Sequence, residues 1–241
     1  MRKKEIRLIL SCCAVSIAAI MVAFTAYAAT LNVPGDYGSI QGAIDNANPA
    51  GGDTVLCQPG AYTPVNFNGT PVTVECAVPR ECIIDCSIDG PSSHGVAFEN
   101  SEGSNSVLTG FKIMNAANAA ILCNGSSPTI TDCNMWDNNN SVCGAIEAYD
   151  SSPTINNCDL SHNTFTVFGG ACFFGGSPTI SNSDFYRNVG DWAGGIHFVD
   201  SSPTLSGCNI TYNSASFDDP ETAGGAVFFG GSPTITGGSI S

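Results

Sequence analysis

The chain has 241 residues, and its 21 acidic residues outnumber its 7 lysines and arginines. The net charge of −14 argues against nucleic acid as a partner, because phosphates must be neutralised by lysine and arginine. It also opposes binding of a polyanionic glycan unless a cation such as calcium lies between the two.

Residues 1–28 have the composition of a secretory signal peptide. MRKKEIR supplies four cationic side chains, residues 8–24 are apolar, and Ala26-Tyr27-Ala28 has the spacing that a signal peptidase cleaves. An uncleaved membrane anchor is the alternative, because the apolar run is just shorter than a bilayer requires. Cleavage would give a secreted or cell-surface chain without a membrane segment. Its net charge would be −17, with 20 acidic residues against Arg80, Lys112 and Arg187.

Residues 29–106 are predicted to form an N-terminal cap and irregular first coils. In residues 39–47 the apolar side chains share one helical face and Ser39 is a suitable N-cap, which predicts a short amphipathic helix buried through Ile40, Ala43, Ile44 and Ala47. Short strands are predicted at 54–57, 72–76 and 82–85, separated by Pro-Gly and Asn-Gly turns.

Residues 107–241 are predicted to form regular repeats. Segments such as SSPTI place prolines at 128, 153, 178, 203 and 233, and a period of about 25 residues is typical of solenoids. Apolar residues recur at the strand spacing of two, and Gly, Asn, Ser, Thr and Pro separate the strands. Stacked blocks would place equivalent strands about 4.8 Å apart in parallel register. We therefore predict an all-β fold, a single right-handed parallel β-helix of about seven or eight coils with an N-terminal capping helix.

One column of the repeat contains only asparagine, ten residues after each proline, at Asn138, Asn163, Asn188 and Asn213. Asparagine tolerates turn conformations, and stacked side-chain amides can hydrogen bond from coil to coil. We predict a structural ladder here.

Ten cysteines remain after signal cleavage, and export permits disulfides, although the sequence does not assign the pairs. Cys133, Cys158 and Cys208 share one column. Cys133 and Cys158 could bridge adjacent coils, but Ser183 and Gly238 occupy the same column, which favours small buried side chains. The spacing of Cys82 and Cys86 is a weak indication of metal.

The sequence ends at Ser241, inside a repeat and before its asparagine. An exposed coil end is an unpaired sheet edge that invites association. We expect that the natural chain continues, or that another chain covers this end, with end-to-end self-association as one form.

The segment LNVPGDYGSIQGAIDNANPAGGDTVLCQPGAY, at residues 31–62, resembles the opening coil of secreted right-handed β-helix proteins of the pectate-lyase-like superfamily. FYRN at residues 185–188, with GGAC, GGIH and GGAV, is similar to the repeats of polymorphic outer-membrane adhesins. The resemblance implies the fold, which hosts lyases, hydrolases, esterases, binders and surface fibres. It carries over no catalytic residue. The chain is poor in basic residues, and the aspartate motifs of pectin esterases and polygalacturonases are not recognisable.

Residues beside the asparagine column are candidates for a glycan site. Asp137, His162 and Arg187 could act as acid, base or charge stabiliser, and aromatic side chains could stack on sugar rings at Trp136, Tyr186, Trp192 and Tyr212. A calcium ion could be held by Asp191, Asp218 and Asp219. The alternative is that stacked opposite charges only satisfy one another. Further candidates on another face are Glu147, His197 and Asp200.

The repetition of like residues favours a carbohydrate-binding, structural or adhesin-like module that contacts glycans or cell-surface polysaccharide. The alternative is a polysaccharide-active enzyme, a lyase or glycoside hydrolase on acidic or neutral glycans. The Asp137, His162 and Arg187 column and the acidic insertion at residues 217–221 favour this alternative.

Overall fold

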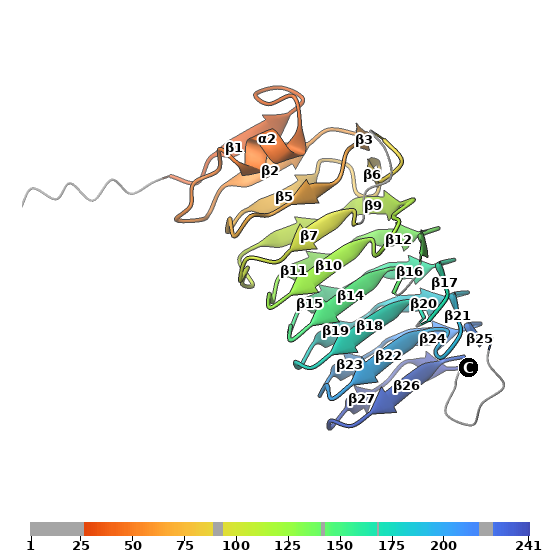
Figure 1. Cartoon of the computed structure of the whole chain (residues 1–241). Helices are drawn as coiled ribbons and strands as arrows, with labels where there is room; N and C mark the ends of the chain where they lie inside the picture. The colour runs from red at the N-terminus through yellow and green to blue at the C-terminus, as the bar shows by residue number, and fades with distance from the viewer. Residues whose placement is uncertain (1–26, 89–93, 141–142, 168, 217–223) are drawn as a thin grey trace, which may run out of the picture.

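The computed structural model describes residues 27–88, 94–140, 143–167, 169–216 and 224–241, which form one right-handed parallel β-helix (Figure 1). The predicted fold is therefore confirmed. Most of the predicted signal peptide and the aspartates at 218 and 219 lie outside these residues. Within the described residues, no helix is long or apolar enough to cross a bilayer.

Four parallel sheets run along the solenoid in the described part of the chain. Sheet A has nine strands, β1 (Thr30–Val33), β2 (Thr54–Cys57), β5 (Thr73–Cys76), β8 (Val107–Thr109), β11 (Thr129–Thr131), β15 (Thr154–Asn156), β19 (Thr179–Ser181), β23 (Thr204–Ser206) and β27 (Thr234–Thr236). Sheet B has eight, β3 (Gly60–Tyr62), β6 (Cys82–Asp85), β9 (Phe111–Met114), β12 (Asn134–Trp136), β16 (Asp159–Ser161), β20 (Asp184–Tyr186), β24 (Asn209–Thr211) and β28 (Ser239–Ile240).

Sheet C has seven strands, β4 (Val65–Asn66), β7 (Val96–Phe98), β10 (Ile121–Asn124), β14 (Ile146–Tyr149), β18 (Ala171–Phe174), β22 (Ile196–Val199) and β26 (Ala226–Phe229). Sheet D is short, with β13 (Asn139–Asn140), β17 (Thr164–Phe165), β21 (Val189–Gly190) and β25 (Ser214–Ala215). Each regular coil visits the sheets in the order A, B, D and C.

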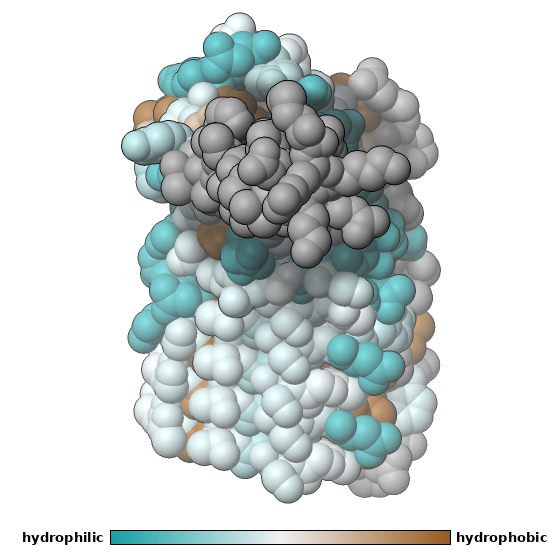
Figure 2. Space-filling model, turned by 90° about the vertical axis from the view of Figure 1, so that its left-hand side faces the viewer, coloured by the Kyte–Doolittle hydropathy of each residue, from teal (hydrophilic) through white to brown (hydrophobic). Residues whose placement is uncertain are grey.

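Register becomes constant where the sequence repeat begins. Partner residues along sheet A differ by 24, 19, 34 and 22 positions in the first coils, and then by 25, 25, 25 and 30. Equivalent residues of consecutive blocks therefore lie over one another. On the side of the solenoid that faces left in Figure 1, residues of similar hydropathy form columns along the axis (Figure 2).

The core consists of stacked apolar columns. Ile130, Ile155, Ile180 and Leu205 point inward from sheet A and are at most 1% exposed. In sheet C, the ring of Phe198 stacks between Phe173 and Phe228, with centroids 5.2 and 5.0 Å apart. Each fully buried side chain of this size contributes about 1.5 to 3 kcal/mol. Glycines accompany these columns because a Cβ at Gly195 would collide with the Gly225 carbonyl of the next coil.

The four asparagines of the repeat are hydrogen bonded in series. The Asn163 side-chain oxygen accepts from the backbone and side-chain N–H groups of Asn138, at 3.0 and 3.1 Å. Asn163 Nδ2 donates to the Asn188 side-chain oxygen and to the Met135 carbonyl, both at 3.0 Å. Asn188 repeats this pattern with Asn213. Each buried amide thus joins two coils at the turn between sheets B and D.

The capping helix is present as α2 (Ile40–Ile44), at the N-terminal end of the solenoid (Figure 1). The Ser39 hydroxyl accepts from the Gly42 N–H as an N-cap, and the predicted apolar face, Ile40, Ala43 and Ile44, is buried. The predicted strands at 54–57 and 82–85 are confirmed, and the third begins one residue later than predicted, at Thr73.

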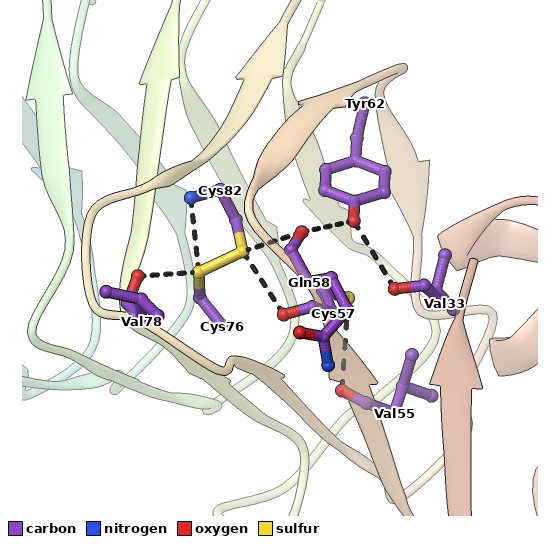
Figure 3. The surroundings of a disulfide bond; sticks show 8 residues. All are labelled: Val33, Val55, Cys57, Gln58, Tyr62, Cys76, Val78 and Cys82. Carbon is purple, nitrogen blue, oxygen red and sulfur yellow. Dashed lines mark hydrogen bonds between the residues drawn. A yellow bond between two sulfur atoms is a disulfide. The ribbon is translucent and has the colours of Figure 1, made fainter. Parts of the chain in front are cut away.

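Disulfides join Cys76 to Cys82 and Cys143 to Cys172. The first closes the turn from β5 to β6. In the corresponding turn of the preceding coil, from β2 to β3, the Tyr62 hydroxyl donates to the Gln58 carbonyl (Figure 3). Because Cys82 is bonded to Cys76, it is not a metal ligand with Cys86, and that interpretation of the spacing is wrong. Cys133, Cys158 and Cys208 are free and buried, as expected of small core side chains.

We predict that Asn163→Ala lowers the free energy of unfolding by about 2 to 4 kcal/mol, because it leaves buried N–H and carbonyl groups of two coils without partners. Urea denaturation of the variant beside Thr164→Ala, an exposed neighbour, measures this. Equal stability of the two variants would contradict the role of the asparagine column.

Candidate polysaccharide-binding face

The outer face of sheet B carries three columns of side chains that do not enter the core. Two columns come from the strands, because alternate residues point outward. The third comes from the residue just before each asparagine, which has a left-handed backbone with φ of 56°, 56°, 53° and 56° at Asp137, His162, Arg187 and Tyr212. Such angles are uncommon outside glycine. The sharp turn there directs these side chains away from the solenoid while the following asparagine turns inward.

Four rings form an aromatic row along this face: Trp136, His162, Tyr186 and Tyr212. Their centroids follow one another at 6.3, 5.7 and 5.5 Å. The rings alternate between the second strand column and the left-handed column, so each of four consecutive coils supplies one ring. The row therefore runs parallel to the solenoid axis.

Two cations lie on the rings of the row. Lys112 Nζ is 4.4 Å from the Trp136 ring centroid, and the Arg187 guanidinium carbon is 5.0 Å from the centroid of Tyr186. Cation–π contacts of this kind stabilise by about 0.5 to 1 kcal/mol at exposed sites. In the described residues, no ion pair joins Asp137, His162 and Arg187.

A polar groove of about 360 Å³ lies beside the row, over β16, β20, β24 and β28. It is lined by Asp159, Asp184, Tyr186, Asn209, Thr211 and Ser239. Asn209 Nδ2 donates to Asp184 at 2.8 Å, and Ser239 Oγ donates to Asn209 at 3.0 Å. Tyr186 borders both the groove and the aromatic row, so a ligand on the rings would also reach the carboxylates.

Sequence similarity places this architecture in a known family. The family described as "Right handed beta helix region" matches residues 66–210 and 144–241, which together cover more than half of the chain. The chain belongs to the right-handed β-helix family.

Among solved structures, this β-helix protein is similar to pectate lyase Pel9A, with a TM-score of 0.47, 15% identity and coverage of 89% of this chain and 79% of that chain. It is also similar to rice weevil pectin methyl esterase, with a TM-score of 0.43, 13% identity and coverage of 89% and 90%. A comparison with curated proteins gives no match. The function has to be inferred from the residues of this chain.

The structure brings some predicted site residues together and separates others. The aromatic row contains Trp136, Tyr186 and Tyr212 together with His162. Trp192 lies instead in the loop from β21 to β22, where its backbone N–H donates to the Val167 carbonyl. Asp191 lies in the same loop, and its predicted calcium partners, Asp218 and Asp219, are outside the described residues. The described residues contain no group of three side chains arranged to hold a metal ion.

Asp159 and Asp184 are groove residues that the sequence prediction missed. They are register partners on β16 and β20, so their strands are about 4.8 Å apart. Both stand six residues after the repeated proline, and the same alignment that identifies the other columns would have placed them together.

The candidates on another face, Glu147 and His197, belong to the outer side of sheet C. Cys172 lies between them, paired to Glu147 on one side and His197 on the other, so they are two coils apart. Tyr149 donates to Glu147, and burial together with this bond raises the pKa of Tyr149 to about 12. Asp200 is exposed beyond the end of β22. These three residues do not form one acid–base centre.

His197 is 2% exposed and lies between the rings of Phe174 and Phe229, with centroids 6.3 and 5.5 Å away. Burial lowers the pKa of this imidazole to about 4. Between about pH 6.5 and 4 the unfolded chain therefore binds a proton that the folded protein does not, and acidification through this window favours unfolding.

The free energy of unfolding should fall less between pH 7 and pH 4.5 in His197→Phe than in the unaltered protein. We predict a difference on the order of 2 kcal/mol, because the variant has no imidazole at position 197 to take up a proton on unfolding. Urea denaturation at both pH values measures the change. The control is His162→Phe, which alters an exposed imidazole. The same pH dependence in both variants would be inconsistent with a buried neutral His197.

Proposed function

We propose that this protein is an exported β-helix that binds polysaccharide along the aromatic row of sheet B without turning it over. The observation that carries the proposal is the row itself, one ring in each of four consecutive coils. Export is proposed from the signal-like composition of residues 1–28.

The row suits an extended glycan rather than a small ligand. Aromatic side chains have an apolar body, and Tyr and Trp also carry a polar handle, so they contact the C–H faces of sugars while leaving hydroxyls to other groups. The polar groove supplies those groups, since Asp184, Asn209 and Thr211 offer acceptors and donors beside Tyr186. A glycan chain parallel to the solenoid axis would contact several rings in succession, so the binding free energy from each ring would add to that of the next.

The negative net charge of the protein favours neutral glycans over acidic ones as ligands. The mature chain would be strongly acidic, and the groove adds Asp159 and Asp184 to the binding face. A neutral polysaccharide meets no repulsion here, whereas an acidic one would need calcium between its carboxylates and those of the protein. We therefore propose neutral glycans as calcium-independent ligands and acidic glycans as calcium-dependent ones.

A polysaccharide-active enzyme is the second candidate, and the Asp159–Asp184 pair favours it. Glycoside hydrolysis uses two carboxyl groups, about 5 Å apart in retaining enzymes. Register partners on adjacent strands can meet that spacing. Against this role, the Asp184 carboxylate already accepts from Asn209 Nδ2 at 2.8 Å, and both aspartates line a groove that is open to solvent.

We predict that Trp136→Ala weakens binding of the best neutral glycan by about tenfold or more, which corresponds to about 1.4 kcal/mol. Calorimetry or affinity electrophoresis against neutral glycans, pectin and alginate, with and without calcium, measures this. Tyr149→Ala removes an exposed ring from sheet C and should leave affinity unchanged. Undiminished binding by Trp136→Ala would contradict the aromatic row as the site, and binding to none of the glycans would favour a purely structural stalk.

The same samples distinguish binding from turnover. Reducing ends and unsaturated products should not accumulate with the unaltered protein. Turnover that is lost in Asp159→Asn, Asp184→Asn, His162→Ala or Arg187→Ala would replace the binding proposal with the enzyme.

A further inference from the structure

One outward column of sheet C is buried over the regular coils, and a pocket lies near the N-terminal end of the sheet. Outward residues of β14, β18 and β22, namely Glu147, Cys172 and His197, are at most 8% exposed. The disulfide from Cys143 to Cys172 fixes the loop after β13 against the outside of β18. Among the described residues, sheet D begins at β13.

This pocket has a volume of about 420 Å³. Its polar lining comes from Gln41, Asn66, His94 and Glu99, and its apolar lining includes Val65 and Leu122. These residues belong to α2, β4, β10 and the segments around β7. The volume is within the range of small-molecule sites, about 300 to 1,000 Å³, and such sites combine an apolar wall with a few oriented polar groups.

Glu99 is held in place by a chain of hydrogen bonds. Asn66 Nδ2 donates to Glu99 Oε1 at 2.7 Å. The Gln41 side chain fixes the Asn66 backbone from both sides, accepting from its N–H at 2.8 Å and donating to its carbonyl at 2.9 Å. Gln41 in turn donates to Asp45 at the end of α2. The carboxylate is therefore oriented through one oxygen before any ligand arrives, which lowers the entropic cost of binding.

The pocket is negatively charged at neutral pH. Its lining contains no lysine or arginine. Burial lowers the pKa of His94, although the nearby carboxylates of Glu147 and Glu99 act in the opposite direction, so the imidazole is uncharged at pH 7. Its Nδ1 accepts from the Ala119 N–H at 3.4 Å. An anionic ligand would be repelled, and a neutral one would gain nothing from the field.

We propose that this pocket binds a small organic cation, a primary ammonium group on a short carbon skeleton, with Glu99 as its counter-ion. The skeleton packs against Val65 and Leu122, and the ammonium group donates to the carboxylate that Asn66 and Gln41 orient. This site is separate from the aromatic row, on a different sheet. It does not depend on the polysaccharide proposal.

Matched pairs of probes isolate the ammonium group. Glucosamine against glucose, and butylamine against butanol, differ in charge with similar skeletons. Titration of the full chain at pH 7, followed by NMR or calorimetry, should show at least tenfold tighter binding of the ammonium member in at least one pair. The pair with the larger ratio identifies an amino sugar or an aliphatic amine as the ligand type.

Three variants assign the effect to the pocket. Glu99→Gln keeps the shape of the side chain and its bond from Asn66, and should remove the preference for the ammonium probe. Glu81→Gln removes an exposed charge elsewhere, and Trp136→Ala alters the aromatic row; both should retain the preference. No preference in either pair, or a preference that persists in Glu99→Gln or disappears in Glu81→Gln or Trp136→Ala, would overturn the proposal.

Discussion

Parallel hydrogen bonding between coils in constant register is the constraint on which the rest of this structure depends. A step of 25 residues brings Ile155 over Ile130 and Asn163 over Asn138, so each side chain meets its own equivalent. Residues that can stack on copies of themselves satisfy this arrangement, which explains the isoleucine, phenylalanine and asparagine columns. The buried asparagine is the most demanding of them, because its donors and acceptors require partners in both neighbouring coils.

The same register aligns the outward side chains in columns but does not restrict which residue types occupy them. Outward positions need only tolerate strand or left-handed backbone, so consecutive coils can place Trp136, His162, Tyr186 and Tyr212 at alternating columns. Lys112 and Arg187, two of the three lysine and arginine residues after position 28, lie on this row. A row of outward rings thus arises here without disturbing the core.

The outer faces of sheets B and C differ in how far their side chains are exposed to solvent. Sheet B is followed by tight turns at the asparagine column, and its outer side stays open over the regular coils. Sheet C is preceded by longer loops, and one of them is tied to it by the Cys143–Cys172 disulfide, so its outward side chains are largely buried. Near the N-terminal end of sheet C the described residues line a pocket, and there Glu99 is positioned by a hydrogen-bond chain that starts at helix α2.

The sequence by itself determined the β-helix, its period and the inward columns, because each depends on a spacing that repeats along the chain. It also determined the N-terminal helix, because the apolar face and the Ser39 N-cap are close together in the sequence. Three of the four rings of the aromatic row were candidates from the sequence alone, since a column is visible in any aligned repeat. Tertiary structure decided the disulfide pairs, the separation of Trp192 from the row and the pocket at Gln41, Asn66 and Glu99. Apart from the Cys76–Cys82 pair, which closes a single turn, these features depend on residues of different coils and loops, and no periodicity relates their positions. Cys143 and Cys172 differ by 29 residues and Asn66 and Glu99 by 33, whereas the repeat is 25.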